Sequence, residues 1–366
     1  MTIDLRSDTV TLPTEAMLDA MRMATFGDDS RDGDPTVQKL EELGAERTGK
    51  EAGLYVPSGT MSNLVALLAH ADRGGEVLLE QSSHSLNAEL GGVSTLAGMF
   101  YHGLPGNRGA MDVDALRERI RGRINRNRLG TALVWMETSH NAAGGAVLPL
   151  AHMSAVRTAA REHEVPVHID GARLFNAAVA LGVRAADIAE HCDSVSFCVS
   201  KGLSAPIGSL VCGSRDFIER ARAFRRMVGG NMRQAGPLAA AGIVALEKMV
   251  ERLEEDHRSA KRLAEGLHKI EATIIDPATV ETNLVRADVR NGGRTAAEWS
   301  AALRQRGVLV SPGRTAWDLR FVTHRHISGR EIDTALGVFN EIWTQFRTKG
   351  QASGAKVQRE SVQAGR

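Results

Sequence analysis

Residues 165–213 read VPVHIDGARLFNAAVALGVRAADIAEHCDSVSFCVSKGLSAPIGSLVCG. Two apolar runs within this stretch, VPVHID (165–170) and SVSFCVS (194–200), predict buried strands. The residues between them are enough for a helical crossover, so the pair indicates a right-handed β-α-β unit with parallel strands. Asp170 ends the first predicted strand, and Lys201 follows the second. We therefore expect both side chains at the same edge of a sheet.

The alternation of strands and helices extends in both directions along the chain. Asp34 is placed to cap a helix that Pro35 begins. Further strands and helices are predicted at AGLYVP (52–57), MSNLVALLAHA (61–71), EVLLEQ (76–81), DVDALRERIRGRI (112–124), TALVWME (131–137), PLAHMSAVRTAAREH (149–163) and GSLVCG (208–213). Strands separated by helical segments are typical of an α/β fold with a large, mostly parallel sheet.

The C-terminal third has a different pattern. The apolar stretch from Pro237 to Met249 continues into VERLEEDHRSAKRLAEGL (250–267), which predicts one long helix leaving the first domain. Beyond it, the segments that predict strands of a smaller α+β domain are ETNLVRADV (281–289), VLVSP (308–312) and DLRFVTH (318–324). The predicted organisation is an N-terminal arm (1–30), a large domain (31–240), a small C-terminal domain (241–347) and a disordered tail without apolar periodicity (348–366).

Composition narrows the class of protein. Lys and Arg number 45 and Asp and Glu 44 among 366 residues, and this balance argues against a nucleic-acid partner. No apolar run approaches the ~18 residues that cross a bilayer, so we expect no membrane span. The chain starts without a cationic stretch followed by an apolar core, and its three cysteines form no C-x-x-C pair. We therefore expect a globular, cytoplasmic protein without a metal site.

Polar groups follow several of the predicted strands. Ser58-Gly59-Thr60 opens a helix and offers backbone N–H groups and a hydroxyl to an anion. His84 and His140 follow two other strands. A phosphate-binding turn, an aspartate, a lysine and two histidines suggest pyridoxal phosphate, which needs a lysine for its attachment and an aspartate beside its pyridine nitrogen. A lone strand-end lysine is usually a solvated surface residue and a lone aspartate usually a helix cap, so the spacing alone leaves these alternatives open.

At these strand ends the sequence closely resembles the threonine aldolases, which are aspartate-aminotransferase-like (fold type I) pyridoxal phosphate enzymes. The resemblance covers about residues 3–345 and implies a large, mostly parallel sheet domain with a small α+β domain. The matching stretches are LRSDTVT (5–11), GDPTVQKLE (33–41), SGTMSN (58–63), ETSHN (137–141), HIDGARLFNA (168–177), SKGLSAPIGSL (200–210), GGNMRQAGPLAAAGIVAL (229–246) and LRFVTH (319–324).

The resemblance implies a role for each matching residue. Lys201 matches the lysine that forms the Schiff base with the cofactor, and Asp170 matches the partner of the pyridine nitrogen. His84 matches the histidine stacked on the cofactor ring and His140 the second active-site histidine, and both are candidates for the catalytic base. The remaining residues are Gly59, Thr60, Ser200 and Arg233 toward the phosphate, with Arg233 coming from a neighbouring subunit, and Ser7, Arg173 and Arg320 around the substrate carboxylate, with Arg173 also beside the cofactor.

Some of these residues also have plain structural interpretations. Thr60 could be only a helix cap, and Ser200 could pair merely with backbone. Arg320, between apolar residues, could form a structural ion pair. His168 lies two residues before Asp170 on the same side of the strand, and we interpret it as supporting or packing.

The implied activity is cleavage of L-threonine, L-allo-threonine and related L-β-hydroxy-α-amino acids to glycine and an aldehyde. The family implies a homo-oligomer, at least a dimer and typically a tetramer, with shared active sites to which the N-terminal arm contributes. One alternative is a pyridoxal phosphate-dependent β-eliminating lyase that releases ammonia and a keto acid. An alternative of another class is a catalytically weak binding or regulatory protein that keeps the fold.

The sequence departs from the family pattern in one loop. Family members often carry a tyrosine before the D-P-T helix start, whereas this chain has Ser30-Arg31-Asp32 there. One interpretation is a solvated loop. The other is an altered substrate pocket that suits a polar or charged β-substituent.

Overall fold

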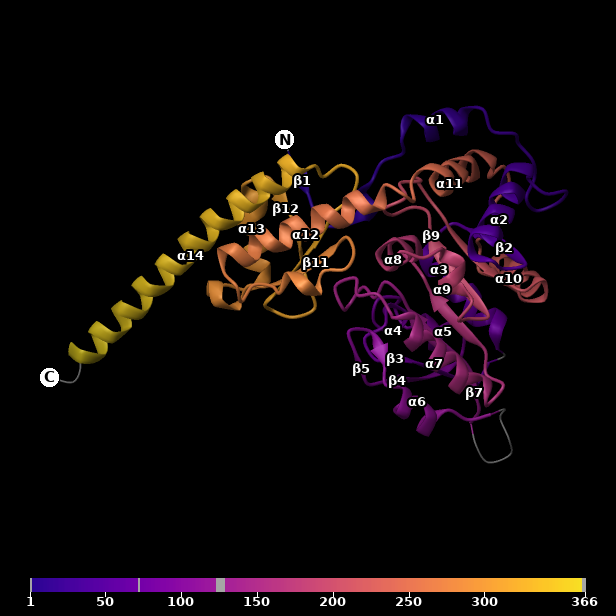
Figure 1. Cartoon of the computed structure of the whole chain (residues 1–366), viewed down its shortest axis with the longest axis horizontal. Coiled ribbons are helices and arrows are strands. Elements are labelled where there is room, and N and C mark those ends of the chain that lie inside the picture. The colour runs from indigo at the N-terminus through magenta and orange to yellow at the C-terminus, as the bar shows by residue number, and fades with distance from the viewer. Residues whose placement is uncertain (1, 72, 123–128, 364–366) are drawn as a thin grey trace. The chain divides into compact units, whose positions relative to one another are not determined.

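The computed structural model describes residues 2–71, 73–122 and 129–363. They form two compact units, one of Thr11–Glu254 and one of the residues up to Val10 together with those from Glu255 onward. Figure 1 shows the chain with its elements labelled. Each unit has its own hydrophobic core. None of the helices in the described residues is both long and apolar enough to cross a membrane.

The larger unit, Thr11–Glu254, contains a sheet of seven strands among its described residues. The strands are β2 (Ala52–Val56), β3 (Glu76–Glu80), β4 (Phe100–Leu104), β7 (Thr131–Glu137), β8 (Val167–Asp170), β9 (Ser194–Cys198) and β10 (Ser209–Gly213). Their order is β2-β10-β9-β8-β7-β3-β4, and β10 alone among these seven runs opposite to the other six. The predicted α/β fold with a mostly parallel sheet is confirmed.

Helices connect the strands of this unit, together with a hairpin of β5 (Gly106–Asn107) and β6 (Ala110–Met111). The Asp34 side chain accepts the N–H groups of Thr36 and Val37 at 2.9 and 3.2 Å, which confirms the predicted cap. The helices are α1 (Glu15–Arg22), α2 (Pro35–Thr48), α3 (Gly59–His70), α4 (His84–Asn87), α5 (Gly92–Thr95), α6 (Val113–Arg119), α7 (Leu150–Arg161), α8 (Leu174–Leu181), α9 (Ala185–Ala189), α10 (Arg215–Met227) and α11 (Gly236–Lys248).

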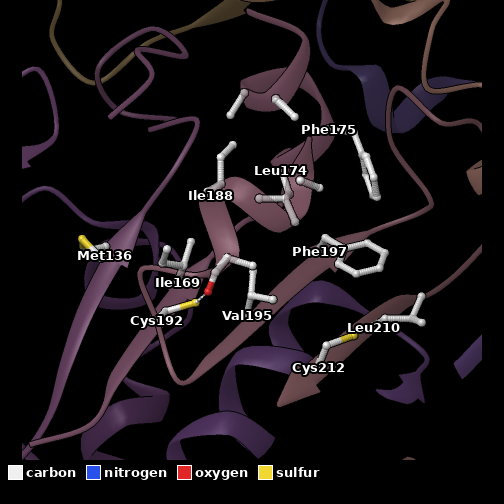
Figure 2. Close-up of a cluster of buried hydrophobic side chains, with 14 of the residues drawn as sticks. Met136, Ile169, Leu174, Phe175, Ile188, Cys192, Val195, Phe197, Leu210 and Cys212 are labelled. Atoms are coloured by element: carbon white, nitrogen blue, oxygen red, sulfur yellow. Dashed lines mark hydrogen bonds between the residues drawn. The ribbon is translucent and has the colours of Figure 1, made fainter. Parts of the chain in front are cut away.

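Apolar side chains anchor β8 and β9 beneath the predicted site. Figure 2 shows Leu174 and Ile188, from α8 and α9, facing the strand residues Ile169 and Val195. All four side chains are buried. Close packing of this kind resists displacement of side chains. It therefore fixes the positions of β8 and β9, and with them the residues at their carboxyl ends.

Two predicted helices end earlier than expected. The helix predicted over 112–124 ends at Arg119, because Ile120 has an extended ψ of 137°, and residues 123 and 124 lie outside the described residues. The prediction of a single long helix from Pro237 onward is wrong. This segment forms two helices, α11 and α12 (Leu253–Ile270), which are separated by a turn at residues 249–252. No Gly or Pro marks this break, and Met249 and Leu253 on either side of it are both buried in the core of the larger unit.

The smaller unit combines residues from both ends of the chain. β1 (Ile3–Asp4) pairs in parallel with β12 (Val308–Leu309). A second sheet has the antiparallel order β11 (Leu284–Asp288), β14 (Asp318–Val322), β13 (Ser311–Pro312). Besides α12, its helices are α13 (Ala296–Gln305) and α14 (Gly329–Gln363), the latter yellow in Figure 1. Short 3-10 turns lie at η1 (Asp8–Val10), η2 (Pro277–Thr279) and η3 (Arg290–Gly292).

The compact units divide the chain after Val10 and after Glu254, whereas the sequence predicts boundaries at residues 30 and 240. The difference at the N-terminus arises because β1 pairs with β12 and so belongs to the smaller unit. Residues 348–363, part of the predicted disordered tail, continue α14 as a helix, and residues 364–366 lie outside the described residues.

Candidate active site

Three neighbouring strands of the larger unit bring polar residues into one row. Glu137 on β7 is in register with Asp170 on β8, and Asp170 is in register with Ser196 on β9. All three residues are buried. Because ligands of such sheets bind at the carboxyl ends of the strands, this row marks the edge where the sequence predicts the site.

The start of α3 packs against this edge. At Gly59 a Cβ atom would lie 2.8 Å from the Sγ atom of Cys198 on β9, so the close approach requires glycine. One helical turn later, Asn63 Nδ2 donates to Asp170 Oδ2 at 2.8 Å. These contacts place the N-terminus of α3 beside the ends of both central strands.

The cap of α3 is Ser58 rather than Thr60. Ser58 Oγ accepts the N–H of Met61 at 3.2 Å, and Thr60 is exposed in the first turn. The interpretation of Thr60 as only a helix cap is therefore wrong. An exposed hydroxyl in the first turn of a twelve-residue helix suits an anion, because the helix dipole and free N–H groups point there.

Lys201 lies in a tight loop that follows β9. Val199 N donates to the Gly208 carbonyl at 3.1 Å and closes the loop. Ser200 Oγ donates to the same carbonyl at 3.2 Å, which is the pairing with backbone that the sequence left open. Thr11 Oγ1 donates to the Lys201 carbonyl at 2.8 Å. The lysine is half-buried, and its backbone is held on both sides.

Gly208 is a conformational requirement of the Lys201 loop. Its φ is +113°, and a Cβ atom at this position would overlap the Tyr55 ring. Gly208→Ala is expected to lower the free energy of unfolding by about 1–3 kcal/mol, as overpacking and an unfavourable φ do. Urea denaturation measures the loss. Gly337→Ala is the matched control, because Gly337 is exposed on α14 and a Cβ atom there would meet no other atom within 4 Å. An equal loss in both variants would contradict the requirement.

Glu89 holds His84 at the same edge. His84 Nδ1 lies 2.9 Å from Glu89 Oε1, and that oxygen also accepts Asn63 Nδ2 at 2.8 Å. A ring nitrogen of His84 and one carboxylate oxygen each of Glu89 and Asp170 all lie within 4.8 Å of one another. The hydrogen bond to Glu89 raises the pKa of His84 against the effect of burial, and the charges of Asp170 and Glu137 act in the same direction. Because Nδ1 faces Glu89, Nε2 is the nitrogen that His84 can offer to another group.

His140 lies in a separate, enclosed cluster. Its Nε2 is 3.2 Å from Glu80 Oε2 and 3.7 Å from Glu137 Oε2, and its side chain is 0% exposed, whereas that of His84 is 35% exposed. Burial opposes the imidazolium, but the nearby carboxylates of Glu80 and Glu137 outweigh it, so the pKa of His140 is raised. A Cβ atom at Gly109, with φ +87°, would overlap the His140 ring.

The Glu137 carboxylate binds backbone N–H groups at or next to both histidines. One of its oxygens accepts the His84 N–H at 2.6 Å, and the other accepts the Asn141 N–H at 2.8 Å. The carboxylate therefore orders the chain segments that carry both histidines. The sequence places Glu137 at a strand end without assigning it this task.

The arginines predicted at the site lie in different surroundings. Arg173 is buried directly before α8 in the larger unit. Arg320 lies on β14 of the smaller unit, where its Nη1 donates to the carbonyl of Arg6, the residue before Ser7. Arg233 is 62% exposed, and its Nη1 lies 3.5 Å from Asp28 Oδ2.

The loop that departs from the family pattern is held within the larger unit. Ser30 Oγ donates to the Met232 carbonyl at 3.1 Å and accepts Asn231 Nδ2 at 2.6 Å. Beside it, Asp29 forms a buried ion pair with Arg225 at 2.6 Å. The interpretation of this segment as merely solvated is wrong for Ser30, whose hydroxyl is engaged by the segment before α11.

Comparison with known proteins agrees with the family resemblance seen in the sequence. The family model described as Beta-eliminating lyase matches residues 4–290. A curated relative, low-specificity L-threonine aldolase 1 of Arabidopsis thaliana, is 42% identical over 343 residues, which cover 93% of this chain and 96% of the relative.

The chain belongs to the threonine aldolase family.

Other threonine aldolases extend the likeness to bacteria and to a solved structure. The low specificity L-threonine aldolase of Escherichia coli K12 is 41% identical over 332 residues, covering 90% of this chain and 96% of that protein. A structurally analysed threonine aldolase of Leishmania major shares the fold with a TM-score of 0.79 at 17% identity, covering 93% of this chain and 99% of its own. The aspartate-aminotransferase-like fold is thereby confirmed.

The residues at the strand ends fit pyridoxal phosphate, the cofactor of this family. Gly59 lets the start of α3 approach Cys198 on β9 closely, and this places a helix N-terminus suited to a phosphate beside the strand ends. Asp170 is a buried carboxylate, 2% exposed, that would accept the pyridine N–H. Lys201 follows the neighbouring strand in a loop held by hydrogen bonds.

Sequence reasoning did not single out Glu89, Asn63 or Glu80. Asn63 follows Gly59 by four residues, so helical spacing could have placed it on the face that meets the site. Glu89 and Glu80 carry no local signal, because each is defined by a contact with a histidine rather than by its neighbours in the sequence.

Proposed function

We propose that this chain is a low-specificity L-threonine aldolase, which cleaves L-threonine, L-allo-threonine and related L-β-hydroxy-α-amino acids to glycine and an aldehyde. The observation that carries the proposal is the His84–Glu89 pair next to Asp170. It supplies a histidine with one nitrogen held by a carboxylate and the other available, beside the expected partner of the cofactor. Cleavage of the Cα–Cβ bond requires a group that removes the proton of the β-hydroxyl, and neutral imidazole suits this task.

Bound pyridoxal phosphate supplies an electron sink for the electron pair of the bond that breaks. Lys201 would hold it covalently through Nζ, and Asp170 would accept the N–H of its pyridine ring. The N-terminal turn of α3, with Gly59 and Thr60, would bind the phosphate. Arg173, together with Ser7 and Arg320, binds the substrate carboxylate, for which the planar guanidinium is well matched.

The two histidines have different tasks in this proposal. His84 Nδ1–H donates a hydrogen bond to Glu89, so Nε2 takes the proton of the β-hydroxyl, directly or through a water molecule. His140 is enclosed between Glu80 and Glu137, so it orders the site rather than exchanging protons with solvent. His84→Gln should therefore reduce kcat more than His140→Gln.

Glu89→Gln is expected to lower the pKa of His84, because the amide removes the carboxylate that stabilises the imidazolium. A lower pKa keeps the imidazole neutral at lower pH, so the acidic limb of the kcat/KM–pH profile should move to lower pH. Rates measured across the acidic limb with threonine as substrate check this. Glu247→Gln on the exposed face of α11 is the control, and an unshifted limb in Glu89→Gln would contradict the role of Glu89.

A second candidate, β-elimination, is favoured by the description of the matching family model. The two reactions differ in their products. Threonine aldolase activity releases glycine and acetaldehyde from threonine in equal amounts, whereas β-elimination releases ammonia and a keto acid. Product analysis of the cofactor-loaded enzyme on threonine, allo-threonine and serine tests the proposal, and ammonia without glycine would refute it.

Two further substrates test the loop at Ser30. β-Hydroxyaspartate and phenylserine, assayed beside threonine, show whether the loop favours a polar or charged β-substituent. The engagement of Ser30 with Asn231 supports a built feature rather than a free loop.

We further propose a cytoplasmic homo-oligomer, at least a dimer and in this family a tetramer. The free thiols of Cys192, Cys198 and Cys212 are consistent with a reducing compartment. Leu12, Met23 and Phe26 near the N-terminus are exposed apolar residues that a second copy would cover. Light scattering of the purified protein measures the oligomeric state.

A further inference from the structure

A continuous chain of hydrogen bonds runs through the larger unit and ends on Asp170. The bonds that link it are His168 Nδ1 to Ser194 Oγ at 2.7 Å, His168 Nε2 to Ser196 Oγ at 3.3 Å, Ser196 Oγ to Asn63 Oδ1 at 3.2 Å and Asn63 Nδ2 to Asp170 Oδ2 at 2.8 Å. At its far end His70 Nε2 bonds to Ser194 Oγ. All of these residues are buried apart from His70, which is half-buried.

The half of the chain nearest Asp170 has only one direction of donation. The ionised carboxylate of Asp170 accepts and does not donate, so Asn63 must present its NH₂ group to it. The Asn63 carbonyl then needs a donor, and Ser196 Oγ is the group in contact with it. Ser196 has a single proton, which this bond uses. Its oxygen must therefore accept the Nε2 proton of His168.

The other half follows from the neutral state of its histidines. Burial lowers the pKa of His168 well below its ordinary value, and it lowers the pKa of His70 to about 4. A neutral His168 with its proton on Nε2 accepts at Nδ1, so Ser194 donates there. Ser194 Oγ in turn accepts from His70 Nε2. Every group thus donates toward Asp170, and such aligned bonds strengthen one another.

We propose that Asn63, Ser196 and His168 are positioning residues that fix the orientation of the Asp170 carboxylate, and through it the protonated pyridine ring of the cofactor. The inference rests on the proposed function, because it places that ring against Asp170. None of these three residues needs to touch the substrate or the cofactor for this role.

The amide of Asn63 shows why the chain is needed. An asparagine side chain has nearly the same shape when its oxygen and nitrogen exchange places, so its orientation depends on its partners. Asn63 Nδ2 serves two carboxylates at once, Asp170 and Glu89, each at 2.8 Å. The reversed amide would point its oxygen at both. The Ser196 hydroxyl, oriented by His168, provides the donor that selects the productive orientation.

Neutron diffraction of deuterium-exchanged crystals of the holoenzyme locates the hydrogens of this chain of hydrogen bonds directly. The expected result is deuterium on His168 Nε2 and none on Nδ1, with the Ser196 deuterium directed at the Asn63 carbonyl. Deuterium on His168 Nδ1 overturns the proposal. This measurement uses the wild-type protein, so it does not depend on whether a variant folds.

Ser196→Ala tests the consequence for the cofactor. The loss of one buried hydrogen bond should raise the Kd of pyridoxal phosphate about tenfold and shift the visible absorption band of the holoenzyme. The matched control is Ser300→Ala, since Ser300 is also buried and donates one bond, to the Val310 carbonyl at 2.8 Å, in the smaller unit. Wild-type Kd and spectrum in Ser196→Ala overturn the inference, whereas a wild-type protein that binds no cofactor at Lys201 overturns the proposed function itself.

Discussion

Lys201→Ala is expected to abolish the visible absorption band of the covalently bound cofactor and to reduce turnover by at least about 10⁴-fold, as the loss of a covalent catalytic group does. The lysine follows β9 in a loop whose ends are closed by hydrogen bonds, so its Nζ is presented from a defined position. No other lysine follows a strand of this edge of the sheet among the described residues. Absorption spectra and aldehyde release from threonine measure both effects.

The control for this variant is Lys39→Ala, on the exposed face of α2, which should keep both the band and the activity. An unchanged spectrum in Lys201→Ala would refute the assignment of the attachment site. A thermal unfolding midpoint close to that of the wild type would show that the loss is chemical, since a half-buried lysine contributes little to the core.

Asp170→Asn is expected to reduce kcat by about 10²–10³-fold, because the neutral amide no longer stabilises the protonated pyridine ring. The change has almost no effect on volume, so packing against α3 should survive. The new amide keeps the 2.8 Å hydrogen bond from Asn63 Nδ2 only with its oxygen at the Oδ2 position, and its NH₂ group then faces the Ala172 N–H that Oδ1 accepts at 3.0 Å. We therefore expect an altered absorption spectrum as well as slower turnover.

Asp187→Asn serves as the control for this change of charge. Asp187 pairs with Arg184 at the exposed start of α9, outside the site. If Asp170→Asn retains wild-type kcat and spectrum, Asp170 is not the partner of the pyridine nitrogen. If both variants lose activity equally, the effect of Asp170→Asn is one of general stability.

Much of the fold could be predicted because its signals are local. Asp34 and Pro35 mark the start of α2 in the sequence. The apolar runs around 131–137, 165–170 and 194–200 correspond to β7, β8 and β9. The break between α11 and α12 could not be predicted, since no residue at 249–252 is a helix breaker and the turn depends on packing in the larger unit. The same limit applies to β1, whose partner β12 lies about 300 residues away in sequence.

By itself the sequence determined which chemical groups follow the strands: an aspartate, a lysine, two histidines and a glycine-containing helix start. A strand end is a local property, so a short stretch of residues is enough to define it. Only the tertiary structure decided what surrounds each group. It placed Glu89 and Asn63 against His84 and Asp170, and it enclosed His140 between Glu80 and Glu137. These differences depend on burial and on contacts between residues far apart in the chain, which no local pattern records.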